Sequence, residues 1–286
     1  MRQFQYISKT KVEGLEAILW RRRKPEITFS ASAPGGLVKL DVKPPAQVAD
    51  LYRRTEALIR KMERHKQLVP MPEQGELEST DFYRDDAVWA NGLFSFKGDF
   101  SLEQADARVV TYLLWRRWRD SVVLLAGSPL NVLGEQVVRE GVWAYGTTGT
   151  LATLVHFTET ALRTDEENVV GVAPAGAQPE VGGLSWTDRG TGWPSASQPD
   201  EKLRPEILSS PPGLALAALC LGHLAGLPSG QIETAFRITQ RLAVNLRGNV
   251  PRWAADLLGR HGREQLDFLR QCQAVYLGSP LYTALP

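Results

Sequence analysis

The chain has little cysteine, histidine or methionine, and it contains no long hydrophobic run. Its two cysteines, Cys220 and Cys272, have apolar neighbours and no metal-ligand spacing, so we expect buried free thiols rather than a disulfide or a metal site. The four histidines lack the HxxxH and HExxH spacings of zinc enzymes. No apolar run approaches the roughly 20 residues that a membrane helix needs, and the N-terminus has no signal-peptide core. We therefore predict a cytoplasmic protein with no metal, no cofactor and no membrane partner.

The composition is that of an ordinary globular protein, with 43% hydrophobic and 23% charged residues among 286. The net charge of +1 conceals an uneven distribution. Residues 1–66 carry 15 basic and 7 acidic side chains, whereas residues 67–100 carry 2 basic and 7 acidic ones. The basic opening segment therefore has a neighbour that can neutralise it. This balance argues against a nucleic-acid partner, because phosphate contacts need a clearly basic face.

One stretch is repeated in shortened form. Residues 121–135, SVVLLAGSPLNVLGE, contain an apolar run that ends in Gly-Ser-Pro. Residues 274–285, AVYLGSPLYTAL, lie near the end of the chain and contain a similar run followed by the same three residues. A short run of β-branched and leucine residues before such a breaker is typical of a strand buried on both faces. Glycine permits a positive φ and proline removes a ladder donor. We expect two interior strands that turn out of one sheet at the same edge.

These two Gly-Ser-Pro corners have two interpretations. They are either ordinary turns or the place where Ser128, Asn131 and Ser279 contact a ligand, since strand ends in open sheets are common binding sites. They do not form a nucleophile elbow, because Ala126 and Leu130 stand where that motif requires glycine.

The whole pattern predicts an α+β fold with a mixed or antiparallel central sheet and a largely helical C-terminal third. Residues 1–140 should form the sheet, and residues 141–286 should be mostly helical, with a long loop at 171–213 and a last strand at 274–278 that returns to the sheet in one compact unit. Strands are predicted at 4–7, 88–96 and 109–118, a hairpin at 27–42, and helices at 10–20, 48–62, 214–227, 228–246, 253–258 and 264–269.

Three further features have alternative interpretations. The run from Trp115 to Arg119 alternates aromatic and basic residues, which either stack on nucleic-acid bases or, as we favour, pack arginine stems over tryptophan faces at a sheet edge. Trp186 and Trp193 in the long loop either close over a pocket or anchor the loop. Residues 147–150 could hold a phosphate at a helix start, although they lack the Gly-Lys-Ser/Thr of a Walker loop.

Short motifs at both ends and in the middle of the chain carry a resemblance. They are Phe4-x-Tyr6-Ile7-Ser8 followed by Lys11, the segment GSPLNVLG at 127–134, and SPLY at 279–282. The chain resembles an uncharacterised actinobacterial-type family, a domain of unknown function, from end to end. The resemblance implies no activity. The stretch at 171–213 looks long for the family, and we take it as a feature of this member.

The residues leave three functions open. We favour a binding or adaptor module for a small molecule or a protein, with Ser128, Asn131, Ser279, Trp186, Trp193 and His223 as ligand contacts, because paired-carboxylate, triad, metal and nucleotide signatures are missing. An enzyme could instead draw its acid and base from a dispersed set, namely Asp85, Asp86 or Glu135 with His156 or His223. Nucleic-acid binding through the basic opening segment and residues 115–119 is the third hypothesis. A buried, paired acid or base in a deep pocket would distinguish the enzyme from the module.

Overall fold

The computed structural model describes residues 2–19, 46–97, 108–133, 142–144, 172–174, 212–246, 249–259 and 262–286. The predicted hairpin at 27–42, residues 147–150 and almost all of the loop at 171–213 lie outside these ranges. The strands are β1 (Gln3–Ile7), β2 (Leu68–Pro70), β3 (Phe82–Lys97), β4 (Arg108–Trp118), β5 (Ser121–Gly127), β6 (Val142–Ala144), β7 (Val172–Pro174), β8 (Ser229–Ala243) and β9 (Ala274–Leu285). The helices are α1 (Lys9–Leu19), α2 (Ala46–Arg64), α5 (Pro212–Leu221), α6 (Arg252–Gly259) and α7 (Arg263–Gln271), with the 3-10 helices η1 (Pro129–Asn131) and η2 (His223–Gly226).

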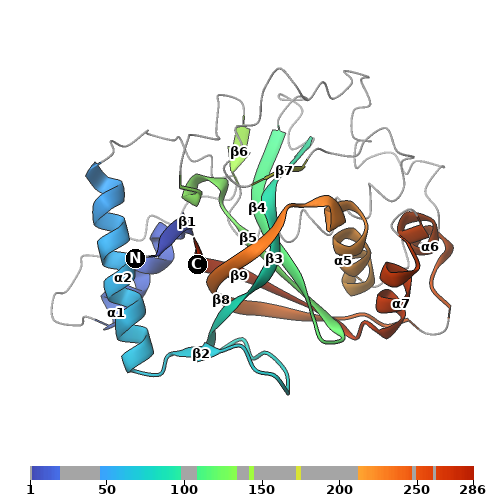
Figure 1. Ribbon diagram of the computed structural model, residues 1–286, viewed down its shortest axis with the longest axis horizontal. Coiled ribbons are helices and arrows are strands. Elements are labelled where there is room, and N and C mark those ends of the chain that lie inside the picture. The colour runs from blue at the N-terminus through green and yellow to red at the C-terminus, as the bar shows by residue number, and fades with distance from the viewer. Residues whose placement is uncertain are drawn as a thin grey trace, which may run out of the picture.

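The nine strands of the described residues form one mixed sheet, and five of them close into a ring (Figure 1). The ring runs β3, β8, β9, β5 and β4, and β4 pairs back onto β3. All neighbours within the ring are antiparallel except β5 and β9, which are parallel. The short strands add to this ring, β1 at β9, β2 and β7 at β3, and β6 at β4. The predicted α+β class with a mixed sheet is confirmed.

The two repeated segments are neighbours in the ring. Ser121 faces Ala274 and Leu125 faces Gly278 in parallel register, and every residue of β5 is buried. Their ends differ, however. β5 stops at Gly127 and η1 follows, whereas β9 continues through its own Gly-Ser-Pro as far as Leu285. The predicted second corner is therefore wrong, and only the first Gly-Ser-Pro leaves the sheet.

The two glycines of these segments are needed for space, not for a turn. Neither Gly127 nor Gly278 has a positive φ. A Cβ on Gly127 would lie 2.5 Å from the Tyr6 hydroxyl oxygen, and a Cβ on Gly278 would lie 2.6 Å from the carbonyl oxygen of Arg237. The pairing of β8 with β9 shifts register beside Gly278 and again beside Pro280, which cannot donate a ladder hydrogen bond. Each glycine of the repeat therefore lies where another group, the Tyr6 side chain or the Arg237 backbone, leaves no space for a Cβ.

The prediction of a largely helical C-terminal third is wrong. The predicted helix at 228–246 is the long strand β8, which pairs with both β3 and β9. Its apolar residues do not alternate simply, because residues 232–236 are all buried and two register shifts interrupt the pairing with β9. Ile232 and Ile238 nevertheless have the β-branched shape that strands favour. The buried helix predicted at 214–227 is confirmed as α5 followed by η2.

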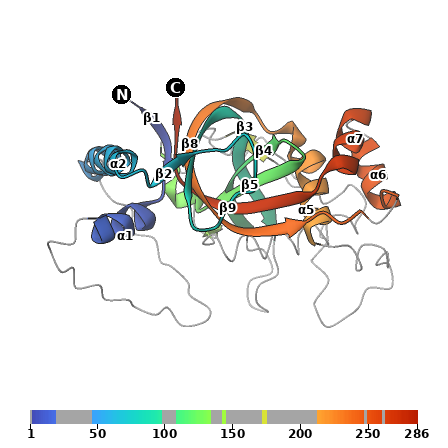
Figure 2. The same cartoon turned by 90° about the horizontal axis from the view of Figure 1, so that it is seen from below.

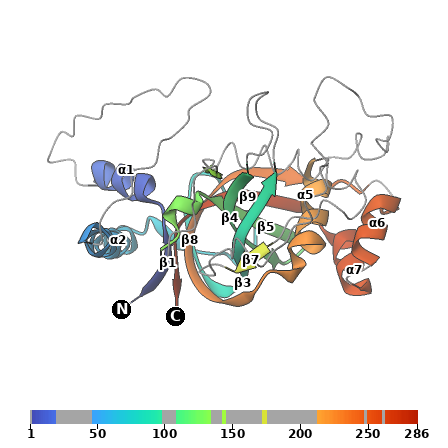
Figure 3. The ribbon, with the colours of Figure 1, turned by 90° about the horizontal axis from the view of Figure 1, so that it is seen from above.

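Helices cover two opposite sides of the ring (Figures 1, 2 and 3). Trp89, Tyr112 and Phe236 belong to the cluster that fills its interior. On one side α5, α6 and α7 pack on β4, β5 and β9, and on the other side α1 and α2 pack on β1 and the second half of β9. The two ends of the chain lie side by side, since Gln3 pairs with Leu285. None of the described helices has both the length and the apolar character of a membrane span.

Candidate functional site

Strand β9 changes its neighbour part-way along its length. On one edge it pairs with β5 up to Gly278, and from Tyr282 onward it pairs on that edge with β1, which runs antiparallel to it. Between these two points, residues 279–281 have no strand partner on this edge among the described residues. We call this place the β9 junction, made of residues 279–281, the first turn of α1 and the corner at 127–131.

The first turn of α1 closes the β9 junction. The backbone N–H of Ser8 donates to the carbonyl oxygen of Leu281 at 2.8 Å. One turn further on, Lys11 Nζ donates to the carbonyl oxygen of Pro280 at 2.8 Å and to the hydroxyl of Ser279. Ser8, the residue before α1, thus contacts β9 through its backbone, and Lys11 contacts it through its side chain. The lysine supplies the donor that a neighbouring strand would otherwise have given to Pro280.

Lys11 is a partly buried amine whose two partners are uncharged. Among the described residues no carboxylate forms an ion pair with it. Burial lowers the pKa of Lys11 to about 7, so both protonation states are populated at neutral pH. The ammonium form has a third N–H available for an anion. The neutral form has a lone pair that can accept the proton of the Ser279 hydroxyl.

The corner after β5 meets Tyr6 instead of Ser279. Asn131 Nδ2 donates to the Tyr6 hydroxyl at 3.3 Å, and the side chain of Ser8 and the backbone of Ser128 also hydrogen-bond this phenol. The Tyr6 ring stacks on Tyr112 with 5.0 Å between ring centroids. Burial raises the pKa of Tyr6 despite these hydrogen bonds, so the phenol is neutral at physiological pH. The polar groups of the corner therefore serve first to hold β1 in place.

The predicted ligand residues divide into three groups. Ser128, Asn131 and Ser279 all lie at the β9 junction, where Tyr6 and Lys11 contact them. His223 begins η2, directly after α5, and so lies on the opposite side of the ring from α1 (Figure 1). Trp186 and Trp193 lie outside the described residues.

The acids proposed for a dispersed catalytic pair occupy different environments. Asp85 belongs to an internal cluster in which it accepts hydrogen bonds from Trp89 Nε1 at 2.9 Å and from Arg116. Asp86 is exposed and accepts from Gln231 at 2.9 Å. Glu135 and His156 lie outside the described residues. Within the described ranges, no group of three or more His, Cys, Asp or Glu side chains is placed to hold a metal ion.

The alternation of arginine and tryptophan in β4 is used for packing. Trp115 and Trp118 are buried, and the guanidinium carbon of Arg119 lies 5.5 Å from the Trp118 ring centroid. That of Arg117 lies 4.7 Å from the ring of Phe268 and its guanidinium is paired with Glu264. The position of Arg119 over Trp118 agrees with the packing interpretation, but the predicted sheet edge is wrong, because β4 is bordered by β3 and β5.

The interpretation of the sequence did not identify Lys11 as a site residue. It entered only as part of the motif Tyr6-Ile7-Ser8-x-x-Lys11. A usable signal was present, because a Ser-x-x-Lys spacing at the start of a helix places both side chains on one side. What the spacing cannot give is the partner, since Ser279 is 268 positions away in the chain.

The model of a family of unknown function, DUF7019, matches residues 2–181. The chain belongs to this family. The matched span contains Tyr6, Lys11, Ser128 and Asn131 and ends before Ser279. Comparison with curated proteins and with solved structures gave no match.

Proposed function

We propose that this DUF7019 member is a binding module for a small organic anion, whose carboxylate or phosphate contacts the Lys11 ammonium at the β9 junction. The observation that supports the proposal is a partly buried amine with two neutral partners and no counter-charge among the described residues. Holding an ammonium away from water is unfavourable unless an opposite charge compensates it. A bound anion would provide that charge, and the side chains of Ser128 and Asn131, which are partly exposed, would complete its contacts.

The experiment is a thermal-shift screen followed by calorimetry. The panel contains mono- and dicarboxylates and phosphomonoesters, tested at pH 6 and pH 8 on the wild type and on Lys11→Met and Lys9→Met. Lys9 is the matched control, because it lies in the same helix but is exposed beside Glu13. We expect a panel member to raise the melting temperature more at pH 6 than at pH 8, in the wild type and in Lys9→Met. An equal shift in Lys11→Met, or no shift with any anion, would overturn the proposal.

A second candidate function rests on the same hydrogen bond. A hydroxyl within reach of an amine that a third group orients is the arrangement of an activated nucleophile, and here Pro280 orients Lys11 beside Ser279. In acyl transfer, Ser279 Oγ would bond to the acyl carbon while its proton passes to Lys11 Nζ. The leaving group would then take that proton, and water would hydrolyse the ester. We favour binding, because Ser279 is only 4% exposed.

The two candidates have opposite pH dependence. Binding of an anion requires the protonated amine and weakens as the pH rises through 7, whereas nucleophilic attack requires the neutral amine and accelerates over the same range. Incubation with a fluorophosphonate at pH 6 and pH 8, followed by peptide mass spectrometry, tests the second. An adduct on Ser279 that forms faster at pH 8 and is lost in Lys11→Met would establish the acyl-transfer candidate. An unmodified Ser279 would eliminate it.

A further inference from the structure

A long groove runs between α2 and the start of β1, away from the β9 junction. It has a volume of about 1190 Å³. Its α2 side chains recur every three or four positions and form one stripe of the helix. The lining residues are Arg2, Gln3, Phe4, Ala49, Tyr52, Arg53, Glu56, Ala57, Arg60, Glu63 and Glu233.

The middle of the groove is apolar and contains aromatic rings. Phe4 and Tyr52 lie with their ring centroids 5.6 Å apart, tilted by 46°. Ala49 and Ala57 are exposed on the same stripe of α2, and their short side chains leave space above the rings. This part of the groove suits one apolar side chain of a ligand.

The three acidic side chains of the groove are paired with two arginines. Arg2 Nε lies 2.9 Å from the Glu233 carboxylate, and the same guanidinium reaches Glu56 at 3.3 Å and Glu63 at 3.5 Å. Arg84 adds contacts to Glu63 at 2.9 Å and to Glu233 at 3.0 Å. The three carboxylates and the two arginines form one network with a net charge of −1, and the positive charge of this surface lies on Arg60 and Arg64.

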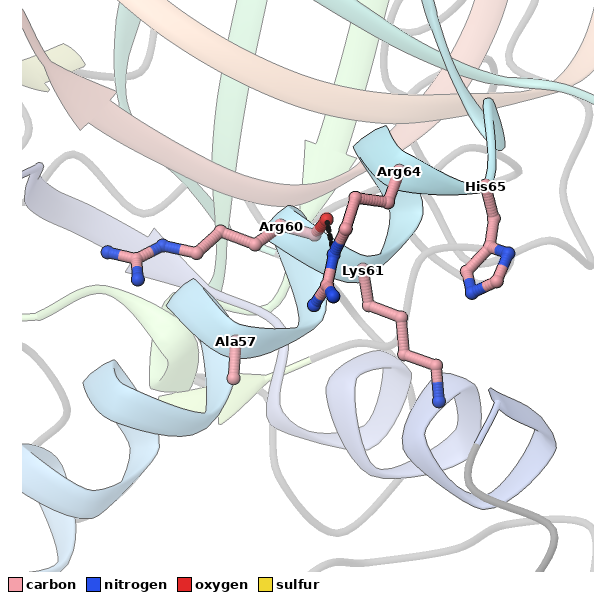
Figure 4. Close-up of a pocket in the computed structure, with 5 residues that line it drawn as sticks. All are labelled: Ala57, Arg60, Lys61, Arg64 and His65. Carbon is pink, nitrogen blue, oxygen red and sulfur yellow. Dashed lines mark hydrogen bonds between the residues drawn. The ribbon is translucent and has the colours of Figure 1, made fainter.

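One end of the groove opens into a basic hollow of about 410 Å³ (Figure 4). Among the described residues it is lined by Ala57, Arg60, Lys61, Arg64 and His65, which are four basic side chains and no acidic one. Arg60 is 73% exposed, and the one ion pair described for it, with Glu56, is 3.9 Å long. Arg64 donates through Nε to the Arg60 carbonyl oxygen at 3.2 Å, which leaves its terminal amino groups facing outward.

We propose that this surface binds an extended acidic peptide of a partner protein. One apolar side chain lies over Phe4 and Tyr52, and acidic side chains of the same peptide contact Arg60, Arg64 and His65. The basic hollow complements acidic side chains, and the apolar part of the groove complements an apolar side chain. A peptide can carry both kinds of side chain one after the other. A nucleic acid fits less well, because its regular phosphates would run past Glu56 and Glu63 in the apolar part. This inference does not depend on Lys11.

The experiment is a selection from a phage-displayed library of random 12-residue peptides on the immobilised full chain. We expect the selected sequences to be enriched at least threefold in Asp and Glu around one apolar residue. The best peptide is then labelled with fluorescein and measured by anisotropy against Arg60→Glu/Arg64→Glu and against the control Arg252→Glu/Arg263→Glu. Arg252 and Arg263 are exposed on α6 and α7, across the ring from α2.

We expect the α2 double variant to bind at least tenfold more weakly and the control to bind like the wild type, with Lys11→Met unchanged. Tyr52→Ala should weaken binding about fivefold without altering its dependence on salt. Selected peptides that are not acidic, no selected peptide at all, or equal loss in both double variants would overturn the proposal. A 12-nucleotide single strand that displaces the peptide and binds more tightly would replace it with a nucleic-acid surface.

Discussion

The amine of Lys11 lies 2.8 Å from the carbonyl oxygen of Pro280, so the first helix of the chain is tied to its last strand. The bond forms at the position where β5 has ended and β1 has turned into α1. A carbonyl in the middle of a strand that lacks a ladder partner needs another donor. Lys11 provides it, and it does so from a partly buried position in which its own charge is unfavourable.

This arrangement predicts a particular pH dependence of stability. The unfolded chain keeps the Lys11 proton up to about pH 10.5, whereas the folded chain releases it near pH 7. Between these values the unfolded state binds more protons, so the free energy of unfolding rises with pH, by up to about 1.4 kcal/mol per pH unit. Urea unfolding at half-unit steps from pH 6.5 to pH 10 should show this slope in the wild type and in Lys9→Met, and not in Lys11→Met. Parallel curves for all three would contradict the assignment.

The glycine of the second repeat should tolerate no side chain. In Gly278→Ala the new methyl would lie 2.6 Å from the Arg237 carbonyl oxygen and 2.9 Å from a methyl of Leu125. We expect a loss of about 1 to 3 kcal/mol in the free energy of unfolding, because β8 and β5 would have to move apart. Gly230→Ala is the matched control in the neighbouring strand β8, since nothing lies within 4 Å of its Cβ position. Similar denaturation midpoints for the two variants would show that the ring can expand.

The two adjacent aspartates of β3 should respond unequally to the same substitution. Asp85 pairs with Arg116 and Trp89, and its side chain is 12% exposed, whereas Asp86 is exposed and contacts Gln231. Asp85→Asn leaves the Arg116 charge partly buried without its partner and should cost about 2 to 3 kcal/mol. Asp86→Asn should change stability by less than about 0.5 kcal/mol. Chemical denaturation of both variants measures the difference, and equal effects would exclude a structural role for the Asp85 cluster.

How far the sequence predicts the fold depends on whether the pattern is local. β5 could be predicted because an apolar run ends at Gly-Ser-Pro. α2 could be predicted because apolar residues recur at helical spacing over 48–62. β8 could not, since residues 232–236 are buried on both faces and two register shifts interrupt the pairing with β9, so its apolar residues do not alternate. The role of Gly278 was also hidden. It depends on the backbone of Arg237, whose position relative to β9 exists only in the folded sheet.

The candidate site could also be predicted from the sequence only in part. Ser128, Asn131 and Ser279 were selected because the repeat drew attention to them. Asn131 contacts Tyr6 and Ser279 contacts Lys11, and their role as ligand contacts stays a prediction. Lys11 was not predicted as a site residue, because a single lysine in an amphipathic helix is usually solvated. Its burial follows from a strand that lies at the other end of the chain. A contact between residues so far apart in the chain produces no repeating pattern that a single sequence could reveal.

Glu233 should control the acid stability of the protein. Burial on its own raises the pKa of Glu233, but hydrogen bonds from Arg2 and Tyr282 and the charge of Arg84 lower it below its ordinary value of 4.5. The stabilisation is therefore complete above pH 4.5 and is lost as the pH falls through the lower pKa of the folded state. Glu233→Gln should be about 2 to 3 kcal/mol less stable at pH 7 and should approach the wild type as the pH falls below 4.

The matched control for this prediction is Glu264→Gln. Glu264 is 79% exposed and also pairs with an arginine, at 2.7 Å from Arg117. An exposed pair contributes little, so this variant should differ from the wild type by less than about 1 kcal/mol at every pH. Thermal unfolding of the three proteins at pH 7, 5, 4 and 3 distinguishes the cases. A difference between Glu233→Gln and the wild type that stays constant from pH 7 to pH 3 would mean that the ionised carboxylate is not what links β8 to β1, because only the charged form gains from Arg2 and Arg84.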